Sequence, residues 1–364
     1  MEVCFLAGTL GRGGAERQLI FMLRALKNAG IRTRLLCLTS GEALEEEIRD
    51  LGVEIRSIDR RGGRLSTLRN VVKELRRQPP DIVQSSHFYT NIYVSIAGRV
   101  NGIPSIGAIR SDLAFELASN GFYGRYQLKL PRHLIANSGL ALERAVNFGI
   151  ARDRIDLVRN VVTCESQKRD ASNASPRATK ILFVGRLGEE KRPELFVELA
   201  HELLSTLPDR QLKFQVVGDG PLRPKLETLA RRYGIGPDVL SLDGERPEIS
   251  DVYECADLVV LTSKHEGTPN VVLEAMSHSI PVVATKVGGI PEVLDSTTGI
   301  IVDPMDFRGL LSATTELILD REARASLGIN GQRYVRKNHS LKYLEGRLTG
   351  IYTKLLERNR NGRG

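Results

Sequence analysis

The chain of 364 residues is 41% hydrophobic and 26% charged, a composition that suits a soluble globular protein long enough for two domains. Its four cysteines form no C-x-x-C pair, which argues against a metal site or a disulfide framework. Tryptophan is absent and aromatic residues make up 5%, which disfavours a carbohydrate-binding module or a single-strand nucleic-acid binder built on stacking platforms. No apolar run approaches the roughly 18 residues of a membrane span. Residues 1–7 are predicted to form a strand rather than a signal peptide, so we expect a cytoplasmic protein.

The excess of positive charge, +8, lies wholly in the first half of the chain. Residues 1–164 hold 24 Lys and Arg against 16 Asp and Glu, whereas residues 165–364 hold 28 of each. Four basic residues are spaced to share one face of a predicted helix: Arg69, Lys73, Arg76 and Arg77. Anionic lipid attracts such residues at about 1 kcal/mol each, so we expect an anionic membrane surface as a partner and peripheral association with the inner face of the cell membrane. A solvated helix face is the alternative, and nucleic acid is not an expected partner because no binding motif accompanies the charge.

Short apolar runs alternate with helical patterns along the chain, as in parallel sheets covered by helices on both faces. The alternation stops at a polar segment, 165–179, and then restarts, which predicts a linker between an N-terminal domain, 1–164, and a C-terminal domain, 180–340. The expected strands of the first half are 3–7, 33–38, 53–58, 82–84, 105–109, 133–136 and 155–158. Those of the second half are 180–184, 213–217, 239–242, 258–261, 281–284 and 299–302. Residues 341–364 are expected to form a last helix with a basic tail.

The first strand leads into a glycine-rich loop and then into a helix. Backbone N–H groups at Gly13 and Gly14 can approach a phosphate closely, because glycine has no Cβ to hold it away. A plain connection between a strand and a helix is an equally good interpretation of this loop.

A second junction of this kind follows the strand at 180–184. There Gly185 precedes two cations, Arg186 and Lys191. Cations at the carboxyl end of a strand suit a pyrophosphate bound in the crevice of a doubly wound sheet. The alternative is that both cations pair with the neighbouring Glu189 and Glu190.

The stretch 264–276 places Glu266 just before a predicted helix and Glu274 inside it. Thr268 is a good N-cap and Pro269 suits the first helical position. The N–H groups at such a helix start attract phosphate; here they belong to Asn270, Val271 and Val272. A diphosphate would then lie between two carboxylates that can accept hydrogen bonds from the vicinal hydroxyls of a sugar or a ribose. The alternative is a surface helix with two solvated glutamates.

In order and spacing, these segments resemble the retaining glycosyltransferases of family 4, the group 1 glycosyl transferases. The matching pieces cover nearly the whole chain: 13–16, 136–138, Gly185 and Arg186 with Lys191, 216–221, Glu266 with Glu274, and 288–292. The resemblance implies the GT-B fold, an α/β architecture of two facing Rossmann-like domains with a deep interdomain cleft. It also implies that the N-terminal domain binds the acceptor, that the C-terminal domain binds the nucleotide sugar, and that the last helix packs back on the N-terminal domain.

The resemblance further assigns roles to single residues. Arg186 and Lys191 would bind the donor diphosphate, Glu266 would contact the transferred sugar, and Glu274 would hold the ribose. Glu266, Arg186 and Lys191 are thus the expected catalytic residues. The expected donor-binding set is Gly13, Gly14, Gly185, Arg186, Lys191, Glu266, Gly267, Thr268, Asn270, Val271 and Glu274.

The activity so implied is the transfer, with retention, of a hexose-type sugar from a nucleotide diphosphate, with a UDP-sugar as the expected donor. The expected acceptor is a lipid-linked or cell-surface glycan, as in polysaccharide biosynthesis. Two cations and a helix start can stabilise the departing diphosphate by themselves, and the sequence contains no Asp-x-Asp, so we expect neither a metal nor another cofactor. Two alternatives stay open: a nucleotide-sugar epimerase on the same architecture, and a non-catalytic nucleotide-sugar-binding partner in a glycan-synthesis complex.

Three positions depart from the family pattern. Many members have a histidine after the strand at 105–109, where this chain has Arg110; a guanidinium cannot act as a base but can bind phosphate or sugar oxygens. His87, one strand earlier, is a possible donor or acceptor contact, with a structural role as the alternative. The usual Pro-Asn-Gly before the linker is replaced by residues 159–161, Arg-Asn-Val. The third position is His265, which could orient Glu266.

Overall fold

The computed structural model describes residues 1–163, 178–246 and 248–361, so most of the predicted linker, 165–177, lies outside the described residues. The chain divides into two compact units, each with its own core. The first unit comprises Met1–Val161 together with Leu341–Gly364, and the second comprises Val162–Ser340.

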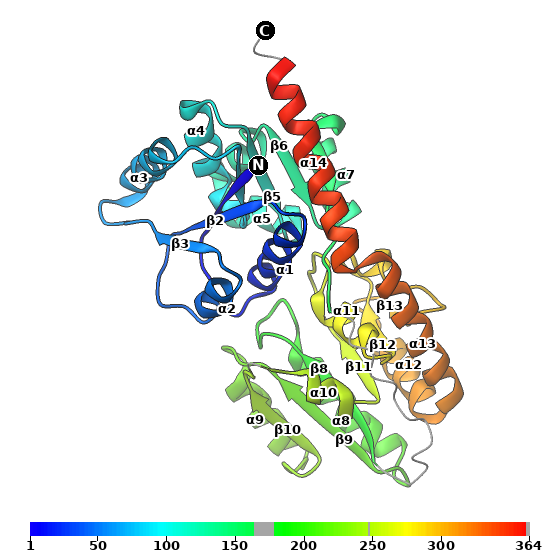
Figure 1. Ribbon diagram of the computed structural model, residues 1–364. Coiled ribbons are helices and arrows are strands. Elements are labelled where there is room, and N and C mark those ends of the chain that lie inside the picture. The colour runs from blue at the N-terminus through cyan, green and yellow to red at the C-terminus, as the bar shows by residue number, and fades with distance from the viewer. Residues whose placement is uncertain (164–177, 247, 362–364) are drawn as a thin grey trace. The chain divides into compact units, whose positions relative to one another are not determined.

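The first unit is built on a parallel sheet of seven strands in the order β3-β2-β1-β4-β5-β6-β7 (Figure 1). The order runs outward in both directions from the β1–β4 pair, as in a doubly wound sheet. The strands are β1 (Glu2–Ala7), β2 (Arg32–Cys37), β3 (Glu54–Ser57), β4 (Ile82–Ser85), β5 (Ser105–Ile109), β6 (His133–Ala136) and β7 (Ile155–Leu157).

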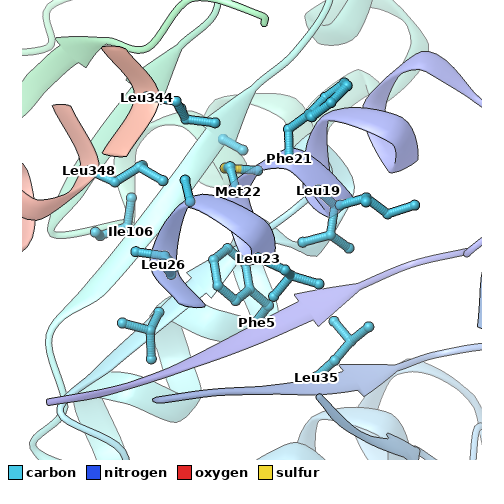
Figure 2. Packing of buried hydrophobic residues seen from close by; sticks show 14 of the residues in the cluster. Phe5, Leu19, Phe21, Met22, Leu23, Leu26, Leu35, Ile106, Leu344 and Leu348 are labelled. Atoms are coloured by element: carbon cyan, nitrogen blue, oxygen red, sulfur yellow. The ribbon is translucent and has the colours of Figure 1, made fainter. Parts of the chain in front are cut away.

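The central helix of the first unit packs against both the sheet and the last helix of the chain. The apolar side chains of α1 (Gly14–Asn28) form a core with the sheet on one side and with Leu344 and Leu348 of α14 (Leu341–Asn361) on another (Figure 2). The other helices of this unit are α2 (Glu45–Asp50), α3 (Gly63–Arg77), α4 (Asn91–Asn101), α5 (Leu113–Ser119), α6 (Gly121–Lys129) and α7 (Gly139–Asn147), with short 3₁₀ turns at Phe88–Thr90 and Arg152–Arg154.

The second unit repeats the plan with a parallel sheet of six strands in the order β10-β9-β8-β11-β12-β13. Its strands are β8 (Thr179–Val184), β9 (Leu212–Val217), β10 (Leu240–Gly244), β11 (Leu258–Leu261), β12 (Val282–Thr285) and β13 (Ile300–Val302). Its helices are α8 (Pro193–Thr206), α9 (Arg223–Arg232), α10 (Ser250–Cys255), α11 (Asn270–Ser277), α12 (Phe307–Leu319) and α13 (Arg321–Asn338), with a 3₁₀ turn at Ile290–Glu292.

Every strand expected from the sequence is present, with ends shifted by no more than two residues. Continuous runs of β-branched and apolar residues made these strands recognisable, because a parallel sheet is buried on both faces. Strands β5, β6 and β11 illustrate this, since all of their residues are buried.

Candidate functional site

The strand order of the second unit reverses between β8 and β11, which are hydrogen-bonded neighbours. In open α/β sheets, ligands bind outside the carboxyl ends of the strands at such a reversal, because the two following loops part there. The loop after β8 carries Arg186 and Lys191, and the loop after β11 carries Glu266. The predicted phosphate-binding cations and the predicted sugar-binding carboxylate therefore share one edge of one sheet.

The loop after β8 is held by the loop after β9. Leu187 N–H donates to the Asp219 carbonyl at 2.9 Å, and Gly185 N–H donates to the Val217 carbonyl at 3.0 Å. Gly218 has φ +137°, and a Cβ there would lie 2.0 Å from the Gly185 carbonyl oxygen. Only glycine fits, so the 216–221 segment that carried part of the resemblance supports the Gly185–Arg186 turn.

Lys191 and Glu266 meet directly as an ion pair between Nζ and Oε1. Ser263 Oγ donates to the same carboxylate oxygen at 2.6 Å, and Glu266 is only 9% exposed. The suggested pairing of Lys191 with Glu189 or Glu190 is therefore not what the structure has. The structure therefore brings a cation and a carboxylate into contact at the point where the loops after β8 and β11 part.

Arg186 lies on the same loop as Lys191 and is exposed. Within the described ranges it makes no ion pair with a carboxylate, so its charge also remains available to a ligand. His265, suggested as a residue that could orient Glu266, is exposed. Lys191 and Ser263 are the groups that hold the Glu266 carboxylate.

The turn that carries Glu266 rests on the loop after β12. Gly289 N–H donates to the Gly267 carbonyl at 2.7 Å. Gly288 has φ +56°, and a Cβ there would lie 1.8 Å from the Glu266 carbonyl oxygen. The paired glycines of the 288–292 segment thus permit a close backbone approach, a role that the sequence reasoning did not assign to them.

Helix α11 starts one residue later than predicted. Pro269, expected at the first helical position, is the N-cap with ψ 121°, and Thr268, expected as the N-cap, precedes it and is buried. The reason is that Pro269 keeps the φ of −72° that its ring imposes but an extended ψ, so helical geometry begins at Asn270. The cap contributes no side-chain hydrogen bond to the first turn of α11, where Val271 also lies.

Glu274, in the second turn of α11, is held by a residue that belongs to no sequence motif. Tyr253 of α10 donates its hydroxyl to Glu274 Oε2 at 2.8 Å. The tyrosine ring is 1% exposed and stacks on His278 with the ring centres 5.2 Å apart. Burial, and then the charge of Glu274, raise the pKa of Tyr253 well above its ordinary value, so the phenol remains a donor.

The first unit has its own switch point between β1 and β4, and His87 lies there. Gly8 N–H donates to His87 Nδ1 at 3.1 Å, and His87 Nε2 lies 3.0 Å from Glu16 Oε1. In this arrangement Nδ1 accepts from the backbone, and Nε2 is placed to donate to the Glu16 carboxylate. Both ring nitrogens already have protein partners, which favours the structural alternative for His87.

The glycine-rich loop of the first unit ends at Gly13, the N-cap of α1, and Gly14 is the first helical residue. A Cβ at Gly13 would lie 2.2 Å from Glu16 Oε2, so the loop packs tightly against a carboxylate. Arg110 follows β5 at the same carboxyl edge, where its Nη2 lies 3.0 Å from Met22 Sδ.

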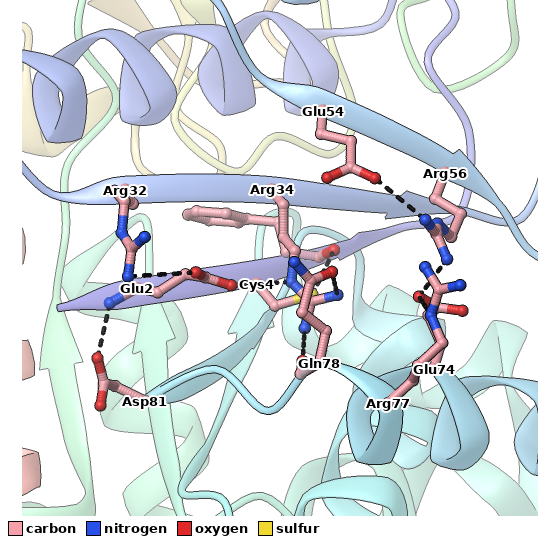
Figure 3. A network of polar contacts seen from close by, with 11 residues as sticks. Glu2, Cys4, Arg32, Arg34, Glu54, Arg56, Glu74, Arg77, Gln78 and Asp81 are labelled. Carbon is pink, nitrogen blue, oxygen red and sulfur yellow. Dashed lines mark hydrogen bonds and ion pairs between the residues drawn. The ribbon is translucent and has the colours of Figure 1, made fainter.

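The basic face of α3 is only partly free. Arg69 and Lys73 are exposed, but Arg77 Nε lies 3.5 Å from Glu74 Oε1, and Arg76 Nε donates to Asn101 Oδ1 at 3.4 Å. Figure 3 shows Glu74 of α3 paired both with Arg77 of the same helix and with Arg56 of β3, so these contacts link α3 to the sheet. No helix within the described ranges combines the length and apolarity that crossing a membrane requires.

Two family models match the chain. The one described as "Glycosyltransferase Family 4" matches residues 12–166, and the one described as "Glycosyl transferases group 1" matches residues 178–320. Alpha-D-kanosaminyltransferase from Streptomyces kanamyceticus is 34% identical over 178 residues, which are 48% of this chain and 45% of that protein. D-inositol 3-phosphate glycosyltransferase from Rhodococcus opacus is 32% identical over 216 residues, 55% of this chain and 48% of that protein. The matches thus span about half the length of these relatives.

Solved structures match the fold over nearly the whole chain. Anabaena HepE in complex with UDP and glucose has a TM-score of 0.84 at 18% identity and covers 97% of this chain and 100% of that one. Sucrose-phosphate synthase from Thermosynechococcus elongatus has a TM-score of 0.80 at 17% identity and covers 98% and 100%. With two parallel-sheet Rossmann-like units and these family matches, the chain belongs to the glycosyltransferases of the GT-B type, with a family 4 segment followed by a group 1 segment.

Proposed function

We propose that the protein transfers a hexose from a nucleotide diphosphate, with retention, to a lipid-linked or cell-surface glycan. The single observation that supports this best is the Lys191–Glu266 pair at the switch point of the second unit, with Arg186 on the same loop as Lys191. A UDP-sugar is the proposed donor, in line with solved HepE structures that carry UDP, UDP with glucose, or UDP-glucose. The relatives' names point to several sugars and acceptors, so the identity of the hexose is left open.

The proposed roles follow from charge and position. The bond between the sugar's anomeric carbon and the diphosphate breaks, that carbon bonds to the acceptor oxygen, and the acceptor's hydroxyl proton passes to the departing diphosphate. The negative charge that develops on the diphosphate is stabilised by Arg186, Lys191 and the start of α11 without a metal. When the donor binds, Lys191 exchanges its contact with Glu266 for a phosphate oxygen, which frees the carboxylate to accept a hydrogen bond from a sugar hydroxyl before the bond breaks. Glu274, oriented by Tyr253, accepts from the ribose hydroxyls.

The remaining donor contacts stay predictions. Gly185, Gly267, Thr268, Asn270 and Val271 lie on the loops after β8 and β11 or at the start of α11. Gly13 and Gly14 lie in the first unit, which also carries the proposed acceptor site.

The test is product analysis with purified protein, a UDP-hexose panel and lipid-linked glycan acceptors, all in the presence of EDTA. Released UDP together with a new glycosidic linkage supports the proposal, and Glu266→Gln should reduce turnover by at least about tenfold. An isomerised nucleotide sugar without transfer would instead identify an epimerase. Activity that appears only with added Mg²⁺ or Mn²⁺ would contradict metal independence.

A non-catalytic role in a glycan-synthesis complex is favoured by one observation, the replacement of the family's usual histidine by Arg110. A deletion strain complemented with Glu266→Gln separates the two functions. Restored glycan synthesis would establish the non-catalytic role, and failure to restore it, with normal protein levels, supports catalysis.

Peripheral membrane association is a further part of the proposal. Helix α6 exposes three aromatic side chains: Phe122 is 75% exposed, Tyr123 50% and Tyr126 45%. Arg64, just inside the N-terminus of α3, lies over the Tyr123 ring at 4.9 Å from its centre. Exposed aromatic rings flanked by arginines suit the headgroup region of an anionic bilayer.

Cosedimentation with phosphatidylglycerol vesicles tests the association. Charge reversal of Arg69 and Lys73, or Phe122→Ser with Tyr126→Ser, should each weaken binding severalfold, and reversal of Arg210 in the second unit should not. Equal sedimentation of all variants, or of wild type with neutral vesicles, would rule out an electrostatic surface here.

A further inference from the structure

The carboxyl edge of the first unit's sheet holds an arginine without a counter-charge. Arg110 follows β5 directly and is half-buried. Its Nη2 donates to Met22 Sδ at 3.0 Å, a weak acceptor, and its Nε is buried without a hydrogen-bond partner. Among the described residues, no carboxylate lies within 4.0 Å of it. Burial accordingly lowers the pKa of Arg110 to about 10.

The carboxylates that follow Arg110 in the chain already have other partners. Asp112 caps α5 and pairs with Arg144 Nη1 at 2.6 Å. Glu116 Oε1 accepts a hydrogen bond from Ser111 Oγ at 2.5 Å. Burying a guanidinium without an anion costs free energy of folding. A ligand that supplies the missing negative charge would offset this cost.

The backbone that presents Arg110 is fixed from two sides. The Asn137 side chain donates to the Arg110 carbonyl at 2.8 Å, while Asn137 N–H donates to the Ile109 carbonyl at 3.1 Å. The Asn91 side chain forms two hydrogen bonds with the backbone of Ala108, at 2.8 and 3.1 Å. The backbone that carries the Arg110 side chain is therefore fixed before any ligand arrives, which favours a preorganised binding site.

A second arginine with an unpartnered buried nitrogen lies two residues before a segment that contacts the same helix. Gln18 and Met22 are one turn apart on α1; Met22 contacts Arg110, and Gln18 forms hydrogen bonds of 2.8 and 2.9 Å with the backbone of Val161. Two residues before Val161, Arg159 also has a buried Nε without a hydrogen-bond partner. Both arginines thus follow strands, β5 and β7, whose carboxyl ends meet the same face of α1.

We infer that Arg110, assisted by Arg159, forms a binding site in the first unit for an oxyanion, a phosphate or a carboxylate, carried by the acceptor substrate. The planar guanidinium fork matches either group with two parallel hydrogen bonds. The assignment to the acceptor rests on the proposed function, whereas the existence of the oxyanion site does not. The site differs from the donor site in place, since Arg186 and Lys191 belong to the second unit.

The test is thermal unfolding with inorganic phosphate, pyrophosphate or glucuronate as probes, each in the presence of saturating UDP and each repeated in Arg186→Ala. Both conditions keep the probes from binding at the proposed donor site, because UDP occupies it and Arg186→Ala removes one of its cations. Arg110→Met is compared with wild type and with two controls, Arg110→Lys, which keeps the charge, and Met22→Leu, which removes only the sulfur acceptor.

An oxyanion should stabilise wild type and Met22→Leu, and its affinity should fall by about 10- to 100-fold in Arg110→Met and by less in Arg110→Lys. Without a probe, Arg110→Met should unfold no earlier than wild type, because it removes an unpaired buried charge; a purely structural arginine would give the opposite sign. Comparing the stabilisation by phosphate with that by glucuronate shows whether the site prefers a phosphate or a carboxylate. Stabilisation by none of the three probes, or by equal amounts in wild type and Arg110→Met, overturns the inference. If UDP does not bind, the proposal of a UDP-sugar donor is wrong. The measurements in Arg186→Ala without UDP then still test the oxyanion site.

Discussion

Tyr253→Phe removes one hydroxyl from the second unit and leaves the packing in place, because the ring can still stack on His278 at 5.2 Å. The lost contact is the 2.8 Å hydrogen bond to Glu274 Oε2. Hydrogen bonds to charged groups contribute about 1.5–3 kcal/mol when they are buried. Glu274 is half-buried, and water can replace part of the contact, so about 1 kcal/mol should be lost from ribose binding, a roughly fivefold weaker affinity for UDP.

Isothermal titration in EDTA measures this, with UDP compared with its 2′,3′-dideoxy analogue. If Glu274 holds the ribose, Tyr253→Phe weakens UDP binding but not binding of the analogue, which lacks both hydroxyls. Tyr233→Phe is the matched control, since Tyr233 stacks on His201 in the same unit with the ring centres 4.2 Å apart. An equal loss for UDP and the analogue, or no loss for either, would refute the link from Tyr253 through Glu274 to ribose.

Two further predictions concern stability. Gly218→Ala should cost about 2–4 kcal/mol in the free energy of unfolding, measured by urea denaturation, because the new Cβ would lie 2.0 Å from the backbone carbonyl oxygen of Gly185. The control is Gly234→Ala, which should cost only about 1 kcal/mol because Gly234 has φ +68° and nothing within 4 Å of the new Cβ. Equal losses in the two variants would contradict the steric explanation. A hydrogen bond from His133 lowers the pKa of Asp156 from 3.8 to about 2, so the carboxylate contributes about 2 kcal/mol above pH 4 that is lost as the pH falls through 2. Asp156→Asn should therefore lose this increment at pH 7 and flatten the acid limb of the stability profile, whereas Asp153→Asn, whose side chain is 62% exposed, should do neither.

The sequence was sufficient wherever one local pattern carries the information. Runs such as those of β5 and β11 predicted their strands, and the glycine and cations at 185–191 were correctly placed on the loop after β8, whose binding of phosphate stays a prediction. The carboxylate at Glu266 was predicted from its place before a helix, and the structure brings it to Lys191 across 75 residues of chain.

Contacts that depend on the three-dimensional packing could not be predicted from the sequence. Tyr253 belongs to no motif, and its hydroxyl reaches Glu274 only because α10 and α11 pack side by side. Ser263 was passed over because a lone serine after a strand has no distinctive spacing. The start of α11 was misplaced by one residue because Pro269 fits the φ of either an N-cap or a first helical residue, and ψ is not encoded by its ring.

The most direct test of a metal-independent donor site at the β8–β11 switch point is unfolding of wild type, Arg186→Ala and Arg210→Ala with UDP in EDTA. Arg210 is the matched control, an exposed cation of the same unit that precedes β9 and so lies at the opposite edge of the sheet. UDP at about 100 times its dissociation constant should raise the stability of wild type and Arg210→Ala by roughly 2.7 kcal/mol and that of Arg186→Ala by much less. No stabilisation of wild type without metal, or the same stabilisation of all three proteins, would contradict the account.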